Sequence, residues 1–487
     1  MDIPMTVRAS EQADPVSARQ RPLCVEAEGV LIRGDPLWEG WFSLLRQRPR
    51  VAMTSLGRRI REGSAAFAAE LSAHVSFDAA QLPYEQALLQ RLRQAKSEGR
   101  TLALITRLPR AWAARIASHL NLFDTVLVND DAHERRRYFC RSTLDAHYGE
   151  RSFDYVGDVS SPVWPLAHSG IALASGKSAI HAAQDNSAGH DVVMRERPSG
   201  RVWLRQLRLH QWVKNLLIFV PLVAARQVGN LRMDTAATAA FIAFGLVASA
   251  NYILNDLLDL PYDRKHPTKR HRPLAAGLLS IKSAVVVMAG LFGLGALFAG
   301  TLPLEFSEVL ALYVAGTLTY SLFLKRSAPL DAFALAGLYT LRVLAGNAAT
   351  GLAPSFWLLA FSIFLFLSLA MAKRHAELRR LCEQGESASR GLGYLPADRE
   401  MVSQLGVGAG YISVLVLALY LNSPEAALLY SRPGVLWFLC VLLLYWISRL
   451  WLVAHRGQLD DDAVIFAIRD RVSRLVALAV VVLLVLA

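Results

Sequence analysis

The chain has 487 residues, of which 53% are hydrophobic, and it carries 52 Lys and Arg against 40 Asp and Glu. This length predicts two or three domains with cores large enough to need no covalent staples. The four cysteines, Cys24, Cys140, Cys382 and Cys440, form no CxxC pair, which excludes a disulfide framework, a zinc ribbon and a thioredoxin-like site.

Basic charge is concentrated in the more hydrophobic part of the chain. Residues 1–200 hold 25 Lys and Arg against 23 Asp and Glu, and the remaining residues hold 27 against 17. Basic residues between apolar runs indicate a membrane surface and anionic ligands, so bilayer lipids are expected as partners and nucleic acid is not. Residues 1–19 have no apolar segment, which argues against a signal peptide and predicts a flexible N-terminus.

Residues 20–185 have the pattern of an α/β domain. The strand-like runs PLCVEAEGVLI, TLALITR, TVLVND and FDYVGD alternate with helical stretches such as PYEQALLQRLRQAKSEG. This alternation predicts a parallel, doubly wound sheet. The polar residues 186–200 are then predicted to form the linker to a second domain.

The strand-like runs resemble the haloacid dehalogenase (HAD) phosphatase fold, whose first motif is DxDGT. Here that motif reads EAEGV, with Glu26 and Glu28 in place of both aspartates. The first aspartate of the family is its nucleophile and the second its acid/base. Displacing such a group by about 1 Å can cost on the order of 10²-fold in rate.

Two of the remaining HAD motifs are also damaged. Thr106 matches the second motif, but no lysine stands near Cys140 and Arg141, where the family has one. Gly157 and Asp158 match the fourth motif, which continues as VSSP without its second acid. We therefore expect a non-catalytic cytoplasmic domain with a structural, regulatory or docking role, and an active phosphatase is the alternative.

Nine apolar runs reach the length of a transmembrane helix, roughly 17–25 residues. They lie at about 208–226, 235–258, 283–302, 306–324, 329–350, 355–373, 402–421, 434–454 and 471–487. The first is the weakest, because polar residues interrupt it. Residues 201–487 therefore predict an all-α membrane domain of about nine transmembrane helices.

Charges in the loops predict how these helices are oriented. The loops after the second, fourth, sixth and eighth runs hold eighteen Lys and Arg, whereas the opposite loops hold Arg226, Arg232 and Arg432. By the positive-inside rule, the basic loops and the N-terminal domain are cytoplasmic and the C-terminus is outside. The expected location is a bacterial inner membrane.

The second apolar run ends in the string NDLLDLPYD, which contains Asn255, Asp256, Asp259 and Asp263. Their spacing of three and four residues places them on one face of a helix, with Pro261 loosening the last turn. Three carboxylates and an amide on one face repel one another unless a cation joins them. Hard oxygen ligands without His or Cys favour Mg²⁺, so the three aspartates are predicted to be metal ligands and catalytic residues.

A basic segment, DRKHPTKRHRPLAAG, begins at the last of these aspartates. Its residues Lys269, Arg270 and Arg272 suit the binding of a metal-bound pyrophosphate, because the ion bridges phosphate oxygens and the cations neutralise the remaining charge. An ordinary solvated loop is the alternative.

The string NDLLDLPYD matches the NDxxDxxxD signature of the UbiA superfamily of intramembrane prenyltransferases, and nine helices are the architecture of that superfamily. The resemblance covers about residues 201–487. Two further segments, LRLHQWVKNLLIFVPL at 207–222 and HPTKRHRPLAAG at 266–277, resemble its decaprenyl-phosphate phosphoribosyltransferase branch.

The loop after the sixth apolar run supports that branch over the aromatic prenyltransferases, which carry a second aspartate-rich motif there. Here the loop is basic, and its candidate substrate-binding residues are Lys373, Arg374, Glu377, Arg390 and Tyr394. A basic loop suits metal-free phosphates, such as the 5-phosphate of ribose and the monophosphate of a lipid. A positive-inside loop with no binding role is the alternative.

Other polar residues within or beside the apolar runs are candidate substrate-binding groups, since ionisable groups in membrane spans face a cavity or each other. They are Gln211, Asn215, Asn255, Tyr320, Lys325 and Arg342, and Asp331 shares a helix face with Arg342. Lys214 joins the catalytic set because its position in QWVKN matches the family. A structural role is the alternative, and Lys325 can also anchor at the membrane interface.

The resemblance implies Mg²⁺-dependent transfer of 5-phosphoribose from phosphoribosyl pyrophosphate (PRPP) to a polyprenyl phosphate. One alternative is a UbiA-type transfer of a prenyl group to an aromatic acceptor. Another is a membrane scaffold or transporter that carries an ion, which is disfavoured because the carboxylates lie at a helix end and not at the bilayer midplane. The sequence is compatible with a homo-oligomer.

Overall fold

The computed structural model describes residues 21–128, 139–159, 161–174, 191–195, 199–383, 393–430, 432–459 and 463–487. Contacts divide the chain into two compact units. The first comprises Met1–Gln206 and Ile253–Val286, and the second comprises Leu207–Tyr252 and Val287–Ala487. Residues 253–286, expected within the membrane domain, thus pack with the N-terminal unit. The predicted N-terminal tail and Arg390 lie outside the described residues.

The first unit is built on a parallel six-stranded sheet with the order β3-β2-β1-β4-β5-β6. Its strands are β1 (Leu23–Glu26), β2 (Leu102–Thr106), β3 (Thr125–Val128), β4 (Asp154–Asp158), β5 (Gly170–Ala174) and β6 (Asp191–Met194). The parallel sheet and the four strands predicted from the sequence are confirmed. Strand β6 lies within the segment predicted as a linker, so the sheet continues further along the chain than expected.

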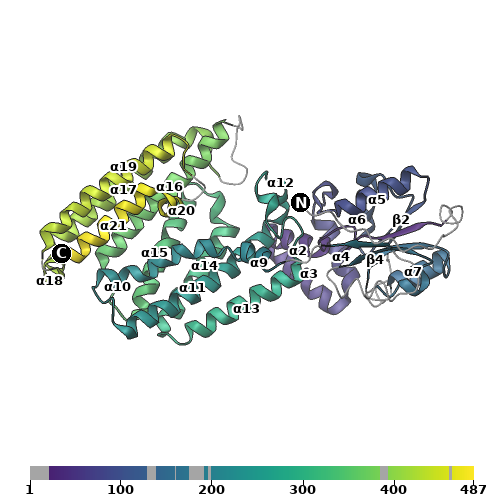
Figure 1. The fold of residues 1–487 in the computed structure, drawn as a ribbon, viewed down its shortest axis with the longest axis horizontal. Coiled ribbons are helices and arrows are strands. Elements are labelled where there is room, and N and C mark those ends of the chain that lie inside the picture. The colour runs from purple at the N-terminus through teal and green to yellow at the C-terminus, as the bar shows by residue number, and fades with distance from the viewer. Residues whose placement is uncertain are drawn as a thin grey trace. The chain divides into compact units, whose positions relative to one another are not determined.

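Helices cover the sheet on both faces, as alternation with parallel strands requires. They are α2 (Pro36–Gln47), α3 (Pro49–Glu62), α4 (Ser64–His74), α5 (Gln86–Ser97), α6 (Arg110–Leu120) and α7 (Phe139–Tyr148), with short 3₁₀ turns η1 (Ala79–Gln81) and η2 (Trp164–Leu166). Figure 1 shows α5 and α6 on one side of the strands and α7 on the other. Ile105, Phe153 and Tyr155 are among the buried residues of a core against this sheet.

The C-terminal segment of the first unit continues from the membrane helix α11 (Leu231–Leu258). It contains α12 (Leu260–Lys265), the 3₁₀ turn η4 (Lys269–His271) and the beginning of α13 (Ile281–Ala299). Helix α9 (Gly200–Leu207) precedes the division between the units.

The described residues of the second unit form helices and the loops that connect them. Besides parts of α11 and α13 it contains η3 (Leu209–Phe219), α10 (Val220–Ala224), α14 (Leu304–Leu322), η5 (Leu324–Arg326), α15 (Leu330–Thr350), α16 (Phe356–Glu383), η6 (Pro396–Asp398), α17 (Arg399–Leu421), α18 (Pro424–Leu429), η7 (Pro433–Leu436), α19 (Trp437–His455), α20 (Ala463–Arg469) and α21 (Arg471–Leu486). Each of the nine predicted apolar runs coincides with helical structure.

Six helices in the described residues are long and apolar enough to cross a membrane: Leu231–Leu258, Ile281–Ala299, Leu330–Thr350, Phe356–Glu383, Pro396–Leu421 and Gly434–His455. The first predicted run forms a shorter apolar helix, Leu209–Ala224. Here η3 is a 3₁₀ helix, in keeping with the polar residues that interrupt this run. The chain is therefore an integral membrane protein, and the count of nine spans stays a prediction.

Candidate active site

The carboxylate motif lies where α11 ends and α12 begins. Asp256 belongs to the last turn of α11, Asp259 is the N-terminal capping residue of α12, and Asp263 lies inside α12. Pro261 occupies the first turn of α12, where its missing N–H costs nothing. The predicted continuous helical face is therefore interrupted once, at Asp259. Asn255, also in the last turn of α11, is half-buried.

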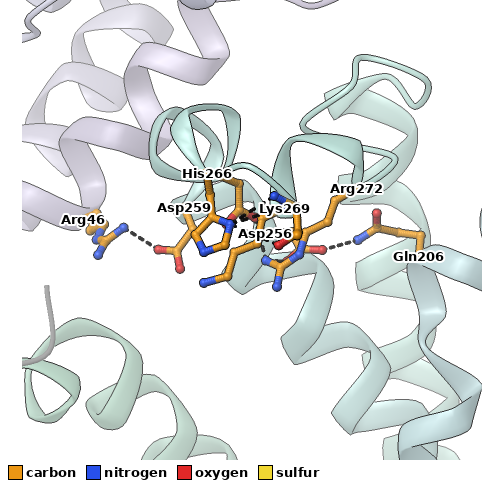
Figure 2. Close-up of polar contacts among 9 residues, drawn as sticks. Arg46, Gln206, Asp256, Asp259, His266, Lys269 and Arg272 are labelled. Atoms are coloured by element: carbon orange, nitrogen blue, oxygen red, sulfur yellow. Dashed lines mark hydrogen bonds and ion pairs between the residues drawn. The ribbon is translucent and has the colours of Figure 1, made fainter. Parts of the chain in front are cut away.

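One arginine joins two of the three aspartates. Arg272 Nη1 donates to Asp256 Oδ1 at 3.1 Å and to Asp263 Oδ2 at 2.6 Å. Both carboxylates are buried. Gln206, the last residue of α9 in this unit, adds a hydrogen bond of 2.8 Å from Nε2 to Asp256 Oδ2. Figure 2 shows these contacts, with Arg46 and Gln206 reaching the aspartates from opposite sides.

The buried carboxylates of Asp256 and Asp263 lie close together, so a positive charge beside them is stabilising. Burial raises the pKa of the Asp263 carboxyl above its ordinary value, and the Arg272 guanidinium opposes that shift. The neighbouring carboxylate of Asp256 raises this pKa as well. The two buried acids share the Arg272 guanidinium, and their negative charge would also stabilise a divalent cation beside them.

The remaining aspartate has a different partner. Arg46, at the end of α2, donates from Nη1 to Asp259 Oδ1. Within the described ranges, no three His, Cys, Asp or Glu side chains form a ready-made metal site. The structure therefore brings Asp256 and Asp263 together and binds Asp259 to Arg46.

The side-chain oxygen atoms around Asp256 and Asp263 nevertheless fit a divalent cation as ligands. Asp256 and Asp263 already hold a cationic nitrogen between them. Beside them, Gln206 Oε1 is buried and accepts no hydrogen bond from the described residues. All these donors are oxygens, as Mg²⁺ prefers.

The basic segment contributes unequally to this site. Arg272 contacts the carboxylates, whereas Arg270 is exposed and its Nε lies 3.3 Å from Nε2 of His271. Lys269 is half-buried, and its backbone N–H lies 3.4 Å from Nδ1 of His266. Of the three predicted phosphate-binding residues in this segment, Arg272 forms ion pairs with Asp256 and Asp263, and Figure 2 shows Lys269 beside the aspartates.

A second cluster of predicted residues lies inside the second unit, around Arg342 of α15. Arg342 Nε donates to Asn215 Oδ1 at 3.0 Å, Nη1 to the Leu338 carbonyl at 2.6 Å and Nη2 to Tyr313 Oη at 3.0 Å. Lys214 Nζ lies 5.6 Å from the centre of the Tyr339 ring. Lys214, Asn215, Tyr313 and Arg342 are all buried.

This cluster has an excess of positive charge. All hydrogen-bond partners of Arg342 are neutral, and across the part of the chain that the structure describes no carboxylate pairs with it. Burying a charge without a counter-ion is costly, so the cluster is suited to receive an anion. Asn215 Nδ2 is also buried without a hydrogen-bond partner among the described residues.

A glycine permits this cluster to form. A Cβ atom at Gly346 would collide with the backbone carbonyl oxygen of Ile218. The missing side chain lets η3 lie directly against α15, as small residues do between membrane helices. Gly346 stands one turn after Arg342, so this close approach brings Asn215 within hydrogen-bond distance of the guanidinium.

In a third cluster, the buried Arg374 of α16 forms ion pairs with two carboxylates. Arg374 Nε pairs with Asp331 and Nη1 with Glu377, while Nη2 donates to Tyr320 Oη at 2.9 Å. Tyr394 Oη donates to the other oxygen of Asp331 at 2.6 Å. Four predicted substrate-binding residues thus meet here, together with Asp331. Two carboxylates more than balance the single guanidinium, so the described cluster has no positive charge left for an anionic ligand, which favours the structural alternative.

The other predicted residues are less clearly placed. Gln211, Lys325 and Lys373 are half-buried, in η3, η5 and α16. Sequence reasoning missed Gln206, Tyr313 and Arg46. A polar residue within the short RVWLRQL stretch and a tyrosine within the fourth apolar run were weak signals for the first two, and Arg46 had none.

The two glutamates of the EAEGV string, Glu26 and Glu28, form a further group of partly buried carboxylates in the first unit. Tyr155 Oη donates to Glu26 Oε2 at 2.9 Å, and the backbone N–H of Arg107 donates to Glu28 Oε1 at 2.8 Å. Burial raises the pKa of both glutamates. A pocket of about 410 Å³ adjoins Glu28 and is also lined by Arg33, Arg107 and Lys282.

The structure thus combines membrane-spanning apolar helices, a carboxylate motif at the end of α11 and buried basic side chains among the helices. The sequence model of the UbiA prenyltransferase family matches residues 216–485. The chain therefore belongs to the UbiA prenyltransferase family and is a membrane transferase of that family.

The chain is similar to several curated proteins. It is 34% identical over 461 residues to protein y4nM of Sinorhizobium fredii, covering 93% of this chain and 89% of that protein. It is 37% identical over 266 residues to nodulation protein NoeC of Azorhizobium caulinodans, covering 54% and 85%. It is 32% identical over 285 residues to decaprenyl-phosphate phosphoribosyltransferase of Mycobacterium tuberculosis, covering 57% and 90%.

Among solved structures, a UbiA homologue from Archaeoglobus fulgidus bound to GPP and Mg²⁺ is 17% identical, with a TM-score of 0.45. That comparison covers 58% of this chain and 99% of the other.

Proposed function

We propose that the protein transfers 5-phosphoribose from PRPP to a polyprenyl phosphate and releases pyrophosphate. The products are polyprenyl-phosphoryl-5-phosphoribose and pyrophosphate. The name and similarity of the mycobacterial relative support this proposal. So does the segment Lys373–Arg380 of α16, which contains four Lys and Arg residues and a single acid, Glu377.

The observation that carries the proposal is the ion pair that Glu377 forms with Arg374. Glu377 Oε2 is already held by the buried Arg374. A prenyl diphosphate with its own metal would need a second set of carboxylates, and the described part of α16 up to Glu383 has only Glu377 and the terminal Glu383. Glu383 in turn accepts from Arg379 Nε at 2.8 Å. Both acids of this described segment are thus engaged by arginines and not placed to hold a second metal, which supports substrates whose phosphates carry none.

The residues of the two units have separate roles in this proposal. Asp256, Asp259 and Asp263 would hold Mg²⁺, which when bound neutralises the pyrophosphate leaving group. Arg272, Lys269 and Arg270 would bind phosphate oxygens and oppose the charge that develops as the C1–O bond of ribose breaks. Lys214, Asn215 and Arg342 would bind another phosphate group of the substrates.

The nucleophile needs no base. A phosphate oxygen of the polyprenyl phosphate is already an anion at neutral pH, and it forms the new bond to C1 of ribose as pyrophosphate departs. The proposal therefore requires no catalytic histidine.

We also propose an inner-membrane location with nine spans, cytoplasmic basic loops and an external C-terminus, as the loop charges predict. For the N-terminal unit we propose a HAD-like, non-catalytic domain. Glu26 stands at the position of the nucleophile but has a raised pKa and accepts a hydrogen bond from Tyr155. The alternative, a phosphatase acting on the 5-phosphate of the product, predicts phosphate release that Glu26→Gln abolishes.

The test is pyrophosphate release by purified full-length protein with Mg²⁺, PRPP and polyprenyl phosphate. Release should require both substrates and fall by about 10²–10³-fold in Asp256→Ala. Asp234→Ala, at the other end of α11, is the matched control and should retain activity. Turnover with a prenyl diphosphate and an aromatic acceptor, without release from PRPP, would replace this proposal by the alternative UbiA reaction.

A further inference from the structure

Helix α2 of the N-terminal sheet domain contacts the carboxylate motif and the residue that follows it, each through one side chain. Glu39 and Arg46 are seven residues apart, which is two helical turns, so they lie on the same face of α2. Both contacts fall inside the first compact unit, because residues 253–286 pack with the N-terminal residues.

The first contact is an anchor. Arg264, the residue after Asp263, donates from both terminal nitrogens to the two oxygens of Glu39 at 2.6 and 2.7 Å. Each side chain of this pair is 9% exposed. Arg264 Nε also donates to the Ala275 carbonyl at 3.0 Å. Bidentate, charge-assisted pairs of this kind have a defined geometry, so α2 is fixed against α12 and the segment that follows it.

The second contact is with the motif itself. The Arg46 guanidinium pairs with Asp259 and lies 4.2 Å from the centre of the Tyr262 ring. Its side chain is 9% exposed, and that of Asp259 is 22% exposed. A cation that contacts both a carboxylate and an aromatic face has a defined position. Arg46 therefore has a fixed place beside Asp259, and Figure 2 shows this contact.

We propose that α2 is a cover on the carboxylate motif and that Arg46 competes with the divalent cation for Asp259. This inference rests on the proposed function, because it takes Asp259 as a metal ligand. A positive charge beside the carboxylate lowers its affinity for a second cation. Metal binding must therefore weaken the Arg46 contact, and by linkage the α2 cover must weaken metal binding by the same factor.

Covering the motif with α2 would be a role for the N-terminal unit that does not require this unit to be catalytic. Anything that lifts α2 would release Asp259 and favour metal loading, and anything that holds α2 down would oppose it. The N-terminal residues thereby regulate the membrane transferase through Asp259, the middle aspartate of the motif.

The test measures Mn²⁺ binding to the full-length protein in detergent, by electron paramagnetic resonance of the free ion. Arg46→Gln should bind Mn²⁺ more tightly than wild type, by on the order of tenfold. Arg46→Lys keeps the charge and should stay close to wild type. The matched control is Arg58→Ala, which removes an exposed arginine paired with Glu70 in the same unit and should leave the affinity unchanged.

A second measurement needs no variant. Hydrogen exchange in peptides covering Pro36–Gln47 should become faster when Mg²⁺ is added to the wild-type protein. Unchanged exchange, or Mn²⁺ affinity that is equal or weaker in Arg46→Gln, would overturn the inference and leave the proposed metal site intact. Absence of Mn²⁺ binding in every protein would overturn the metal site and the inference together.

Discussion

Two buried arginines of the membrane helices, Arg342 and Arg374, have opposite surroundings. Arg374 is enclosed by the carboxylates of Asp331 and Glu377, whereas Arg342 is bonded to an amide, a carbonyl and a phenol. A buried cation with its own counter-ions contributes to structure, and one with neutral partners has charge left for a ligand. Basic residues at similar depth in one fold therefore need not share a function.

The largest effect should follow from breaking the Arg374 cluster. In Asp331→Asn the buried guanidinium loses a counter-ion, which costs about 3–5 kcal/mol when one partner of a buried pair is removed. Thermal unfolding of the detergent-solubilised protein measures the loss. Glu377→Gln is the control, because Glu377 is more exposed and its removal should cost less. Equal melting temperatures for Asp331→Asn and wild type would contradict the structural role.

Removing Arg342 should affect activity more than stability. Arg342→Gln leaves no carboxylate unpaired but removes the charge proposed to bind a phosphate, so phosphoribosyl transfer should fall by about 10²-fold. Transfer rates and melting temperature, measured on the same preparation, separate the two effects. A loss of stability as large as that of Asp331→Asn would remove the distinction between the two arginines.

Adding a side chain at Gly346 tests the close packing of η3 against α15, which places Asn215 beside Arg342. Gly346→Val should force η3 away from α15 and cost about 1–3 kcal/mol through overpacking. Since Asn215 would move with η3, transfer should fall together with the melting temperature. Gly337→Val on the same helix is the control, because a Cβ there meets no atom within 4 Å.

The smallest effect is expected from the phenol beside Arg342. Tyr313→Phe removes one hydrogen bond to the guanidinium, worth about 0.5–1.5 kcal/mol, and should lower transfer several-fold at most. A steady-state titration of both substrates would show which phosphate is affected. An effect equal to that of Arg342→Gln would mean that Tyr313, and not the arginine, contacts the substrate.

Local pattern was enough to predict the parallel sheet and the apolar helices, because each depends on residues close together in the chain, whereas the role of the carboxylate motif stays a prediction. Strand β6 was missed because VVM is its only apolar stretch within a polar segment. The predicted face of four polar residues was interrupted at Asp259 by the turn that precedes Pro261.

The partners of the motif could not be predicted in the same way. Arg46 and Asp259 are 213 residues apart, and neither Arg46 nor Glu39 lies in a recognisable motif. The two arginines of the membrane helices also look alike in the sequence. Their difference depends on which side chains meet across helices, as when Asp331 pairs with Arg374 and not with Arg342 on its own helix.

The ion pair between Glu39 and Arg264 joins the N-terminal part of the chain to the segment that follows the carboxylate motif. A shortened chain that began at residue 201 would keep Arg264 without the acid that neutralises it, next to the last aspartate of the motif. Such a fragment would therefore carry an extra charge in its most sensitive segment. A chain without the N-terminal part would have to change residue 264 as well, or neutralise it with another acid.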